Sequence, residues 1–141
     1  MYLAFLIRHA EPVAGWHGSD HDRPLSERGR RQAQFIADKL VGSGIQRIVC
    51  SPYARTRETA QIIGAGLGVS PQPEPRLAIG CDFAVELHGP VTLYVAHANN
   101  IPEALWTLGV QCTACGHAGL WRVTVGADGR ATEAKYTEAR G

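Results

Sequence analysis

Short apolar runs and helical repeats of apolar residues alternate along the chain. Three runs contain few polar interruptions, which is typical of strands buried on both faces of a parallel sheet: residues 2–8, 45–50 and 91–97. Between the first two runs, apolar residues recur at helical spacing over residues 26–41. The pattern therefore predicts strands that alternate with helices, as in α/β proteins.

Capping residues place the starts of the predicted helices. Ser26 is a good N-cap, and Glu27 lies in the first turn, where the helix dipole favours an anion. Ser51 is expected to cap a second helix, with Pro52 at its first position, that ends around residues 64–68. Asn99 and Asn100 follow the third strand and can cap a helix ending at Gly109.

The remaining segments complete the predicted topology. Residues 69–76 are rich in proline and can form at most an edge strand. Residues 119–125 and 130–136 alternate and flank an Ala-Asp-Gly turn, which predicts a terminal β-hairpin. The expected fold is a three-layer α/β sandwich, with a mostly parallel central sheet and helices on both faces. Residues 1–141 are expected to form a single domain.

Composition narrows the classes of function. Hydrophobic residues make up 45% and charged residues 19% of the chain, as in ordinary globular domains. A formal net charge of +1 gives no general attraction to nucleic acid or to anionic membranes. The N-terminal apolar run is too short to span a membrane and lacks the features of a signal peptide. We therefore expect a cytoplasmic protein whose four cysteines are reduced.

Cationic and imidazole side chains follow the three predicted strands where each strand ends. Arg8 and His9 end the first strand, Arg55 lies just after the second, and His97 ends the third. Ligands of open α/β sheets bind in the crevice beyond the carboxyl ends of the strands. Two imidazoles, two guanidiniums and two helix N-termini would meet there, which predicts an anion site. Arg23, in the loop after the first strand, can close over it.

Four segments resemble, in order, the motifs of the histidine phosphatase superfamily, also called phosphoglycerate mutase-like. They are LIRHAE (6–11), RPLSERGRRQA (23–33), SPYARTRETA (51–60) and VAH (95–97). The short chain and the RPLS block look most like the small phosphohistidine phosphatase (SixA-type) branch. The resemblance implies a metal-independent phosphatase without a cofactor. His9 would be the phosphorylated nucleophile, and Arg8, Arg55, His97 and Arg23 would bind phosphate.

The sequence departs from the family pattern at the proton donor. Many members carry a Glu in a block resembling R-L-x-E, but Ile79 occupies that position in RLAIG (76–80). The acid is therefore missing or supplied by Asp20, Asp22 or Asp82, of which Asp20 is our first choice. An imidazole leaving group needs less protonation than an alkoxide, so the departure favours a phosphohistidine protein or another activated phosphate compound as the phosphorylated substrate. The alternatives are a phosphatase of small phosphate monoesters and a non-catalytic phosphate-binding module.

Several other residues are open to a structural or a functional interpretation. Cys112, Cys115 and His117 resemble half of a zinc site, although small reduced thiols near a loop are the simpler interpretation. His17, His21 and His88 are expected to be exposed loop residues. Trp106 and Trp121 are expected to lie in the core.

Overall fold

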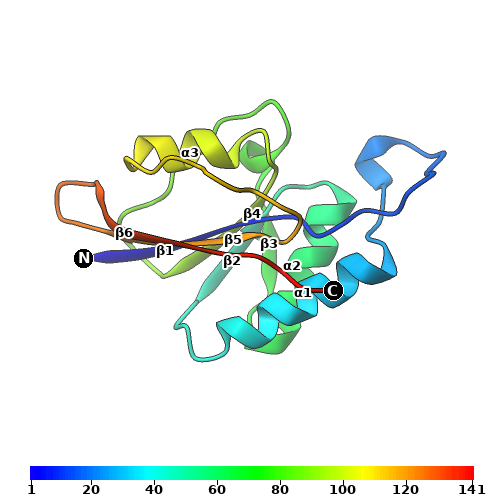
Figure 1. The fold of residues 1–141 in the computed structure, drawn as a ribbon, viewed down its shortest axis with the longest axis horizontal. Helices are drawn as coiled ribbons and strands as arrows, with labels where there is room; N and C mark the ends of the chain where they lie inside the picture. The colour runs from blue at the N-terminus through cyan, green and yellow to red at the C-terminus, as the bar shows by residue number, and fades with distance from the viewer.

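The computed structural model describes residues 1–141, which form one six-stranded sheet in the order β3-β2-β4-β1-β5-β6 (Figure 1). The strands are β1 (Tyr2–Arg8), β2 (Arg47–Cys50), β3 (Pro71–Pro73), β4 (Thr92–Ala96), β5 (Leu120–Val125) and β6 (Ala131–Thr137). The helices are α1 (Glu27–Leu40), α2 (Ala54–Leu67) and α3 (Ile101–Thr107), with short 3-10 helices η1 (Asp20–Asp22) and η2 (Pro75–Leu77).

The sheet is mostly parallel, as predicted. β1 and β2 both pair in parallel with β4, and the proline-rich β3 pairs in parallel with β2 at the edge of the sheet. The hairpin of β5 and β6 adds two antiparallel strands beside β1. Helices α1 and α2 cover one face of the sheet and α3 covers the other (Figure 1), which confirms the three-layer sandwich.

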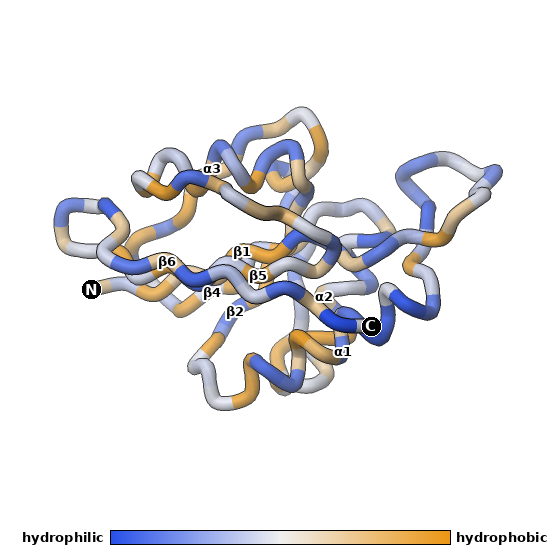
Figure 2. Tube along the Cα trace, in the orientation of Figure 1, coloured by the Kyte–Doolittle hydropathy of each residue, from blue (hydrophilic) through white to orange (hydrophobic).

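The apolar runs lack alternation because both faces of the central strands are buried. Phe5 and Ile7 of β1 pack into the cluster beneath α1 and α2, whereas Ala4 and Leu6 pack into the cluster beneath α3. Figure 2 shows the apolar colouring concentrated on the central strands and on the sheet-facing sides of α1 and α2. This two-sided burial holds the strand ends in fixed positions.

The start of α1 is tied to the chain that follows β1. The Ser26 hydroxyl accepts a hydrogen bond from the Gly29 backbone N–H at 2.9 Å, which confirms the predicted N-cap. A Cβ atom on Gly29 would overlap the carbonyl oxygen of Glu11, so only glycine allows this approach. That oxygen also accepts from the Ser26 backbone N–H at 2.9 Å. The glycine thus lets the helix start sit directly against the segment after β1.

The predicted start of α2 was wrong. The helix begins at Ala54 with Tyr53 as its N-cap, so Ser51 and Pro52 lie in the turn before it. The Ser51 hydroxyl accepts from the Tyr53 backbone N–H at 3.4 Å and contacts the His97 ring at 2.8 Å. The Ser-Pro pair, which resembles a helix start in the sequence, therefore lies in a turn where Ser51 joins the end of β2 to the end of β4.

The structure differs from two predictions about α3, the burial of Trp106 and the capping by an asparagine side chain. Trp121 is buried as predicted, but Trp106 is 68% exposed, so its assignment to the core was wrong. The buried residues of α3 recur at helical spacing, as Ile101, Ala104 and Leu105, and Trp106 lies on the other side of the helix. Asn100 occupies the N-cap position of α3 without a side-chain cap hydrogen bond.

None of the helices combines the length and the apolar content that crossing a bilayer requires.

Candidate active site

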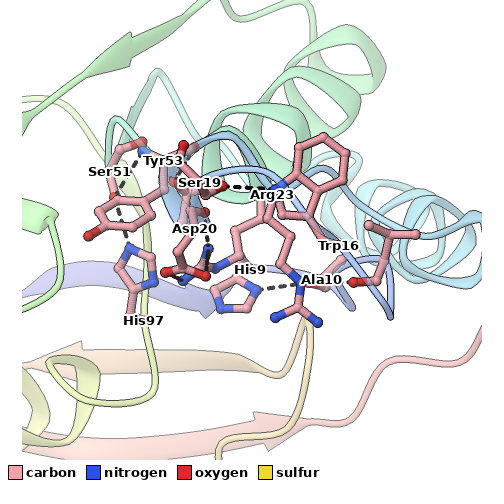
Figure 3. A network of polar contacts seen from close by, with 12 residues as sticks. His9, Ala10, Trp16, Ser19, Asp20, Arg23, Ser51, Tyr53 and His97 are labelled. Carbon is pink, nitrogen blue, oxygen red and sulfur yellow. Dashed lines mark hydrogen bonds and ion pairs between the residues drawn. The ribbon is translucent and has the colours of Figure 1, made fainter.

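His9 and His97 lie side by side at the carboxyl ends of β1 and β4. The two strands pair in parallel with Arg8 opposite Ala96, so the residues that follow them are neighbours. The ring centroids of His9 and His97 are 5.3 Å apart, and both residues are almost fully buried (Figure 3). The predicted meeting of these two strand ends is confirmed.

One hydrogen bond determines which nitrogen of His9 is free. The Nδ1 atom lies 2.8 Å from the carbonyl oxygen of Ala10 (Figure 3). A carbonyl oxygen only accepts hydrogen bonds, so Nδ1 carries the proton and donates it. The Nε2 atom of the neutral ring then keeps its lone pair.

Electrostatics keep the His9 ring neutral. The pKa of His9 is lowered from its ordinary value of 6.5 to about 2, chiefly by burial. The hydrogen bond to Ala10 opposes this effect, and the neighbouring His97, Arg8 and Arg55 add to it. At neutral pH the ring is therefore an uncharged imidazole, which is the nucleophilic form.

His97 is held by Ser51 from the end of β2. The Nε2 atom lies 2.8 Å from the Ser51 hydroxyl oxygen (Figure 3), whereas the Nδ1 atom is buried without a hydrogen-bond partner. Burial, followed by the charge of Arg55, lowers the pKa of His97 to about 4. His97 is therefore also neutral near pH 7 and has one buried ring nitrogen without a protein partner.

Three arginines surround the two rings. Arg8 donates from Nη1 to the Cys115 carbonyl oxygen at 3.1 Å, while its Nε atom is buried without a partner. Arg55 projects from the first turn of α2 and lies over the Tyr53 ring, with Cζ at 4.9 Å from the ring centroid. Arg23 donates from Nε to the Val13 carbonyl oxygen at 2.8 Å, which turns its guanidinium toward the site (Figure 3).

Asp20 reaches the site from η1, whereas the other two candidate acids do not. Its carboxylate accepts hydrogen bonds from Arg55 at 3.2 and 3.3 Å. Asp22 instead accepts from the Ser19 hydroxyl at 2.9 Å, and Asp82 lines a separate hollow beside Tyr94. Of the three carboxylates considered from the sequence, only Asp20 contacts a site residue.

A surface hollow of about 490 Å³ opens over His9. Its lining consists of Arg8, His9, Glu11, Pro12, Ala14, Arg23, Arg55 and His117. The lining thus contains three guanidiniums and one carboxylate, and such a concentration of planar cationic donors suits a phosphate-sized anion.

Sequence reasoning missed the place of His117. Its ring centroid lies 5.7 Å from that of His9, and it precedes β5. No group of three or more His, Cys, Asp or Glu side chains is arranged to hold a metal ion. Because β5 runs antiparallel to β1, its start lies beside the end of β1. The sequence predicted the hairpin that follows His117. It did not show that β5 pairs with β1, and that pairing is what brings His117 beside His9.

His17, His21 and His88 are all exposed, as predicted, although His21 lies in η1 and not in a loop.

The fold and the strand-end residues define a phosphoglycerate mutase-like α/β protein. The chain belongs to the histidine phosphatase superfamily (branch 1), whose family model matches residues 4–78. It is 38% identical over 82 residues to a protein of Yersinia enterocolitica named "Probable phosphoglycerate mutase GpmB". The match covers 55% of this chain and 37% of that protein, so the chain spans well under half of that relative's length.

Solved structures share the fold over nearly the whole chain. The protein histidine phosphatase SixA complexed with tungstate superposes with a TM-score of 0.76 at 19% identity, covering 98% of this chain and 96% of that one. A mycobacterial glucosyl-3-phosphoglycerate phosphatase complexed with VO3 superposes with a TM-score of 0.71 at 16% identity, covering 98% of both chains. These likenesses establish the phosphoglycerate mutase-like fold that the sequence predicted.

Proposed function

We propose that the protein is a metal-independent phosphatase that transfers a phosphoryl group from its substrate to His9 Nε2 and then to water. The proposal is supported by membership of the histidine phosphatase superfamily and by a neutral His9 whose Nε2 lone pair is free. A histidine nucleophile divides the transfer into two easier steps.

The observation that carries the proposal is a pair of buried polar atoms without partners. Arg8 Nε and His97 Nδ1 are the buried side-chain nitrogens that make no hydrogen bond in the protein. An unsatisfied buried polar group costs about 1–3 kcal/mol. A phosphoryl group beside His9 would supply acceptor oxygens to both nitrogens, so the site is prepared for an anion.

The three arginines and His97 have roles that follow from the hydrogen bonds that their N–H groups can donate. Arg8, Arg55 and Arg23 bind the phosphoryl oxygens and offset the charge that builds up during transfer. The Ser51 hydroxyl donates to His97 Nε2, which leaves the proton of His97 on Nδ1. His97 then donates that proton as a hydrogen bond to a phosphoryl oxygen. These assignments follow the predicted set of site residues.

In the first step His9 Nε2 attacks phosphorus and the bond to the leaving group breaks. The Nδ1 proton of His9 stays on the ring, held by the Ala10 carbonyl oxygen at 2.8 Å. In the second step water attacks phosphorus, the P–N bond breaks, and its electron pair returns to Nε2. Inorganic phosphate and neutral His9 are regenerated.

The proposed substrate is phosphohistidine on a protein or a small activated phosphate compound. Ile79 stands where many relatives carry an acid, and it follows η2 in a half-buried segment. Asp20 is our choice of proton donor, because it is the one carboxylate of the three candidates that contacts a site residue. An imidazole leaving group needs this acid less than a sugar or glycerate alkoxide does.

The test is direct detection of the phosphoenzyme. Rapid quenching with a ³²P-labelled phosphohistidine peptide is expected to yield an acid-labile, alkali-stable label on His9. His9→Ala should abolish both label and turnover, whereas His88→Ala, in an exposed loop, should keep them. Turnover that survives in His9→Ala would refute the proposed nucleophile. Faster hydrolysis of alkyl monophosphates than of the peptide would refute the proposed substrate class.

A further inference from the structure

The hollow over His9 contains an imidazole that the proposed reaction leaves unused. His117 lines the hollow together with His9 and Arg23, and its ring is tilted by 42° to that of His9. His97 and His117 each lie next to His9, and they belong to different strand ends. No hydrogen bond to another protein group holds the His117 ring, so its nitrogens are available to a ligand.

The backbone around His117 is fixed in an unusual conformation. The Gly119 N–H donates to the Gly116 carbonyl oxygen at 2.8 Å, closing a turn with His117 and Ala118 at its centre. Ala118 has φ of 55°, and no other residue except glycine has a positive φ. A turn of this kind normally places glycine there, and a non-glycine residue costs on the order of 1–3 kcal/mol.

Two contacts hold this turn against the site. The Ala118 N–H donates to the carbonyl oxygen of His9 at 3.0 Å. The Gly116 N–H donates to the Tyr136 hydroxyl at 2.9 Å. The strained turn is therefore attached to the nucleophile's own backbone, which keeps His117 over the hollow.

Among the side chains lining the hollow, His117 is the proton acceptor that makes no hydrogen bond within the protein. The arginines only donate, and His9 is the nucleophile. One oxygen of Glu11 accepts from the Ser26 hydroxyl at 2.8 Å, and the other lies 3.4 Å from Arg28. Asp20 pairs with Arg55 and does not line the hollow. The second step of the reaction releases a proton from water, and His117, an imidazole of the lining with no protein partner, can take it.

We propose that His117 is the general base that activates water for hydrolysis of phosphorylated His9. The inference rests on the proposed function and assigns a base to its second step. Water forms a bond to phosphorus while its proton passes to a ring nitrogen of His117. The P–N bond breaks, its electron pair returns to His9 Nε2, and the His117 imidazolium then releases the proton to solvent.

The charges around His117 favour the neutral ring that such a base requires. Burial, followed by the charge of Arg8, lowers its pKa from the ordinary value of 6.5, and Glu11 opposes this effect. The titratable and charged side chains that share its two hollows come from β1, the following loop, α1, α2 and the segment after β6: Arg8, His9, Glu11, Arg23, Arg28, Arg55, Glu138 and Arg140.

The experiment separates the two steps with 4-nitrophenyl phosphate, whose leaving group departs without a strong acid. His117→Asn should retain the burst of nitrophenolate and the label on His9. Decay of the phosphoenzyme should slow by about 10²-fold, the lower end of the usual effect of general acid–base catalysis. His88→Asn is the matched control and should decay at the wild-type rate.

A second variant protects the test against a loss of folding. His117→Ala should also accumulate phosphoenzyme, and free imidazole in solution should accelerate its decay, an effect that a merely structural residue would not produce. The wild-type decay rate should rise with pH through the pKa of His117, and the variants should lose this rise. Wild-type decay in His117→Asn would overturn the inference alone. Absence of any phosphoenzyme in the wild-type protein would overturn the proposed function itself.

Discussion

Individual residues of the site combine fixed positive charge with imidazoles that stay neutral. The guanidiniums of Arg8 and Arg55 are permanent cations, and they help burial to lower the pKa of His9 to about 2. The same environment that attracts an anion therefore keeps the nucleophile unprotonated. Ser51 and the Ala10 carbonyl oxygen then orient the two rings through one hydrogen bond each.

Asp20 is the residue whose role a single substitution tests best. Asp20→Asn should reduce turnover of an alkyl phosphate by about 10²-fold, because its leaving group would lose the proposed acid. Turnover of 4-nitrophenyl phosphate should change only a few-fold. Inorganic phosphate should inhibit the variant more strongly, because the carboxylate no longer competes for Arg55. Steady-state kinetics on both substrates measure these effects.

Asp22→Asn is the matched control for this prediction. Asp22 lies in the same 3-10 helix and bonds Ser19 instead of Arg55. It should behave as the wild-type protein on both substrates. Equal losses on both substrates in Asp20→Asn would contradict the assignment of Asp20 as proton donor.

At the scale of elements, the site depends on how strand ends are tied to the segments that follow them. Asn100 illustrates this: its side chain accepts from the His97 N–H at 3.0 Å and donates to the Leu77 carbonyl oxygen at 2.8 Å. The residue predicted to cap α3 thus joins the end of β4 to η2. Gly29 does the same at the start of α1 by allowing close contact with Glu11.

Gly29→Ala is expected to destabilise the protein by about 2 kcal/mol or more, within the range of substitutions that force atoms to overlap. Helix propensity alone would favour alanine by about 1 kcal/mol. The new Cβ would meet the Glu11 backbone and push α1 away from the segment after β1. Urea unfolding monitored by circular dichroism measures the effect. Arg31→Ala, on an exposed position of the same helix, should stay within about 0.5 kcal/mol of the wild type. A stabilised Gly29→Ala variant would contradict the close approach.

At the scale of the whole molecule, the buried histidines link stability to pH. The pKa of His97 is lowered to about 4 and that of His9 to about 2 in the folded protein, whereas the unfolded chain has ordinary values near 6.5. Below about pH 6.5 the unfolded state therefore binds more protons, and the free energy of unfolding falls as the pH falls. The stability that depends on the two neutral histidines is therefore fully present above about pH 6.5. The part that depends on His97 is lost by about pH 4.

Urea unfolding between pH 7.5 and pH 4.5 tests this linkage. The free energy of unfolding should decrease on the order of 1.4 kcal/mol per pH unit for each histidine that stays neutral. A variant with His9→Asn and His97→Asn should show a clearly weaker dependence, and exposed His88→Asn should keep the full one. A wild-type protein equally stable at both ends of this range would contradict the lowered pKa values.

The fold was predictable because each local pattern agreed with the topology. Unalternating runs marked strands buried on both faces, Ser26 marked the start of α1, and the prolines of residues 71–73 marked an edge strand. The misplaced start of α2 and the exposed Trp106 have a common cause. Both predictions used only the neighbouring sequence. The contacts of Ser51, and the side of α3 that faces the sheet, depend on segments elsewhere in the chain.

The apolar runs predicted the alternation of strands and helices, with Arg8, His9 and His97 at the ends of two strands and Arg55 a few residues after a third. The tertiary structure added that β4 lies between β1 and β2, so that His9, His97 and Ser51 become neighbours. It also decided that the antiparallel β5 begins beside the end of β1 and brings His117 to the nucleophile. Strand periodicity reports which face of a strand is buried. Which strands pair depends on packing between distant segments, and that pairing assembles the site.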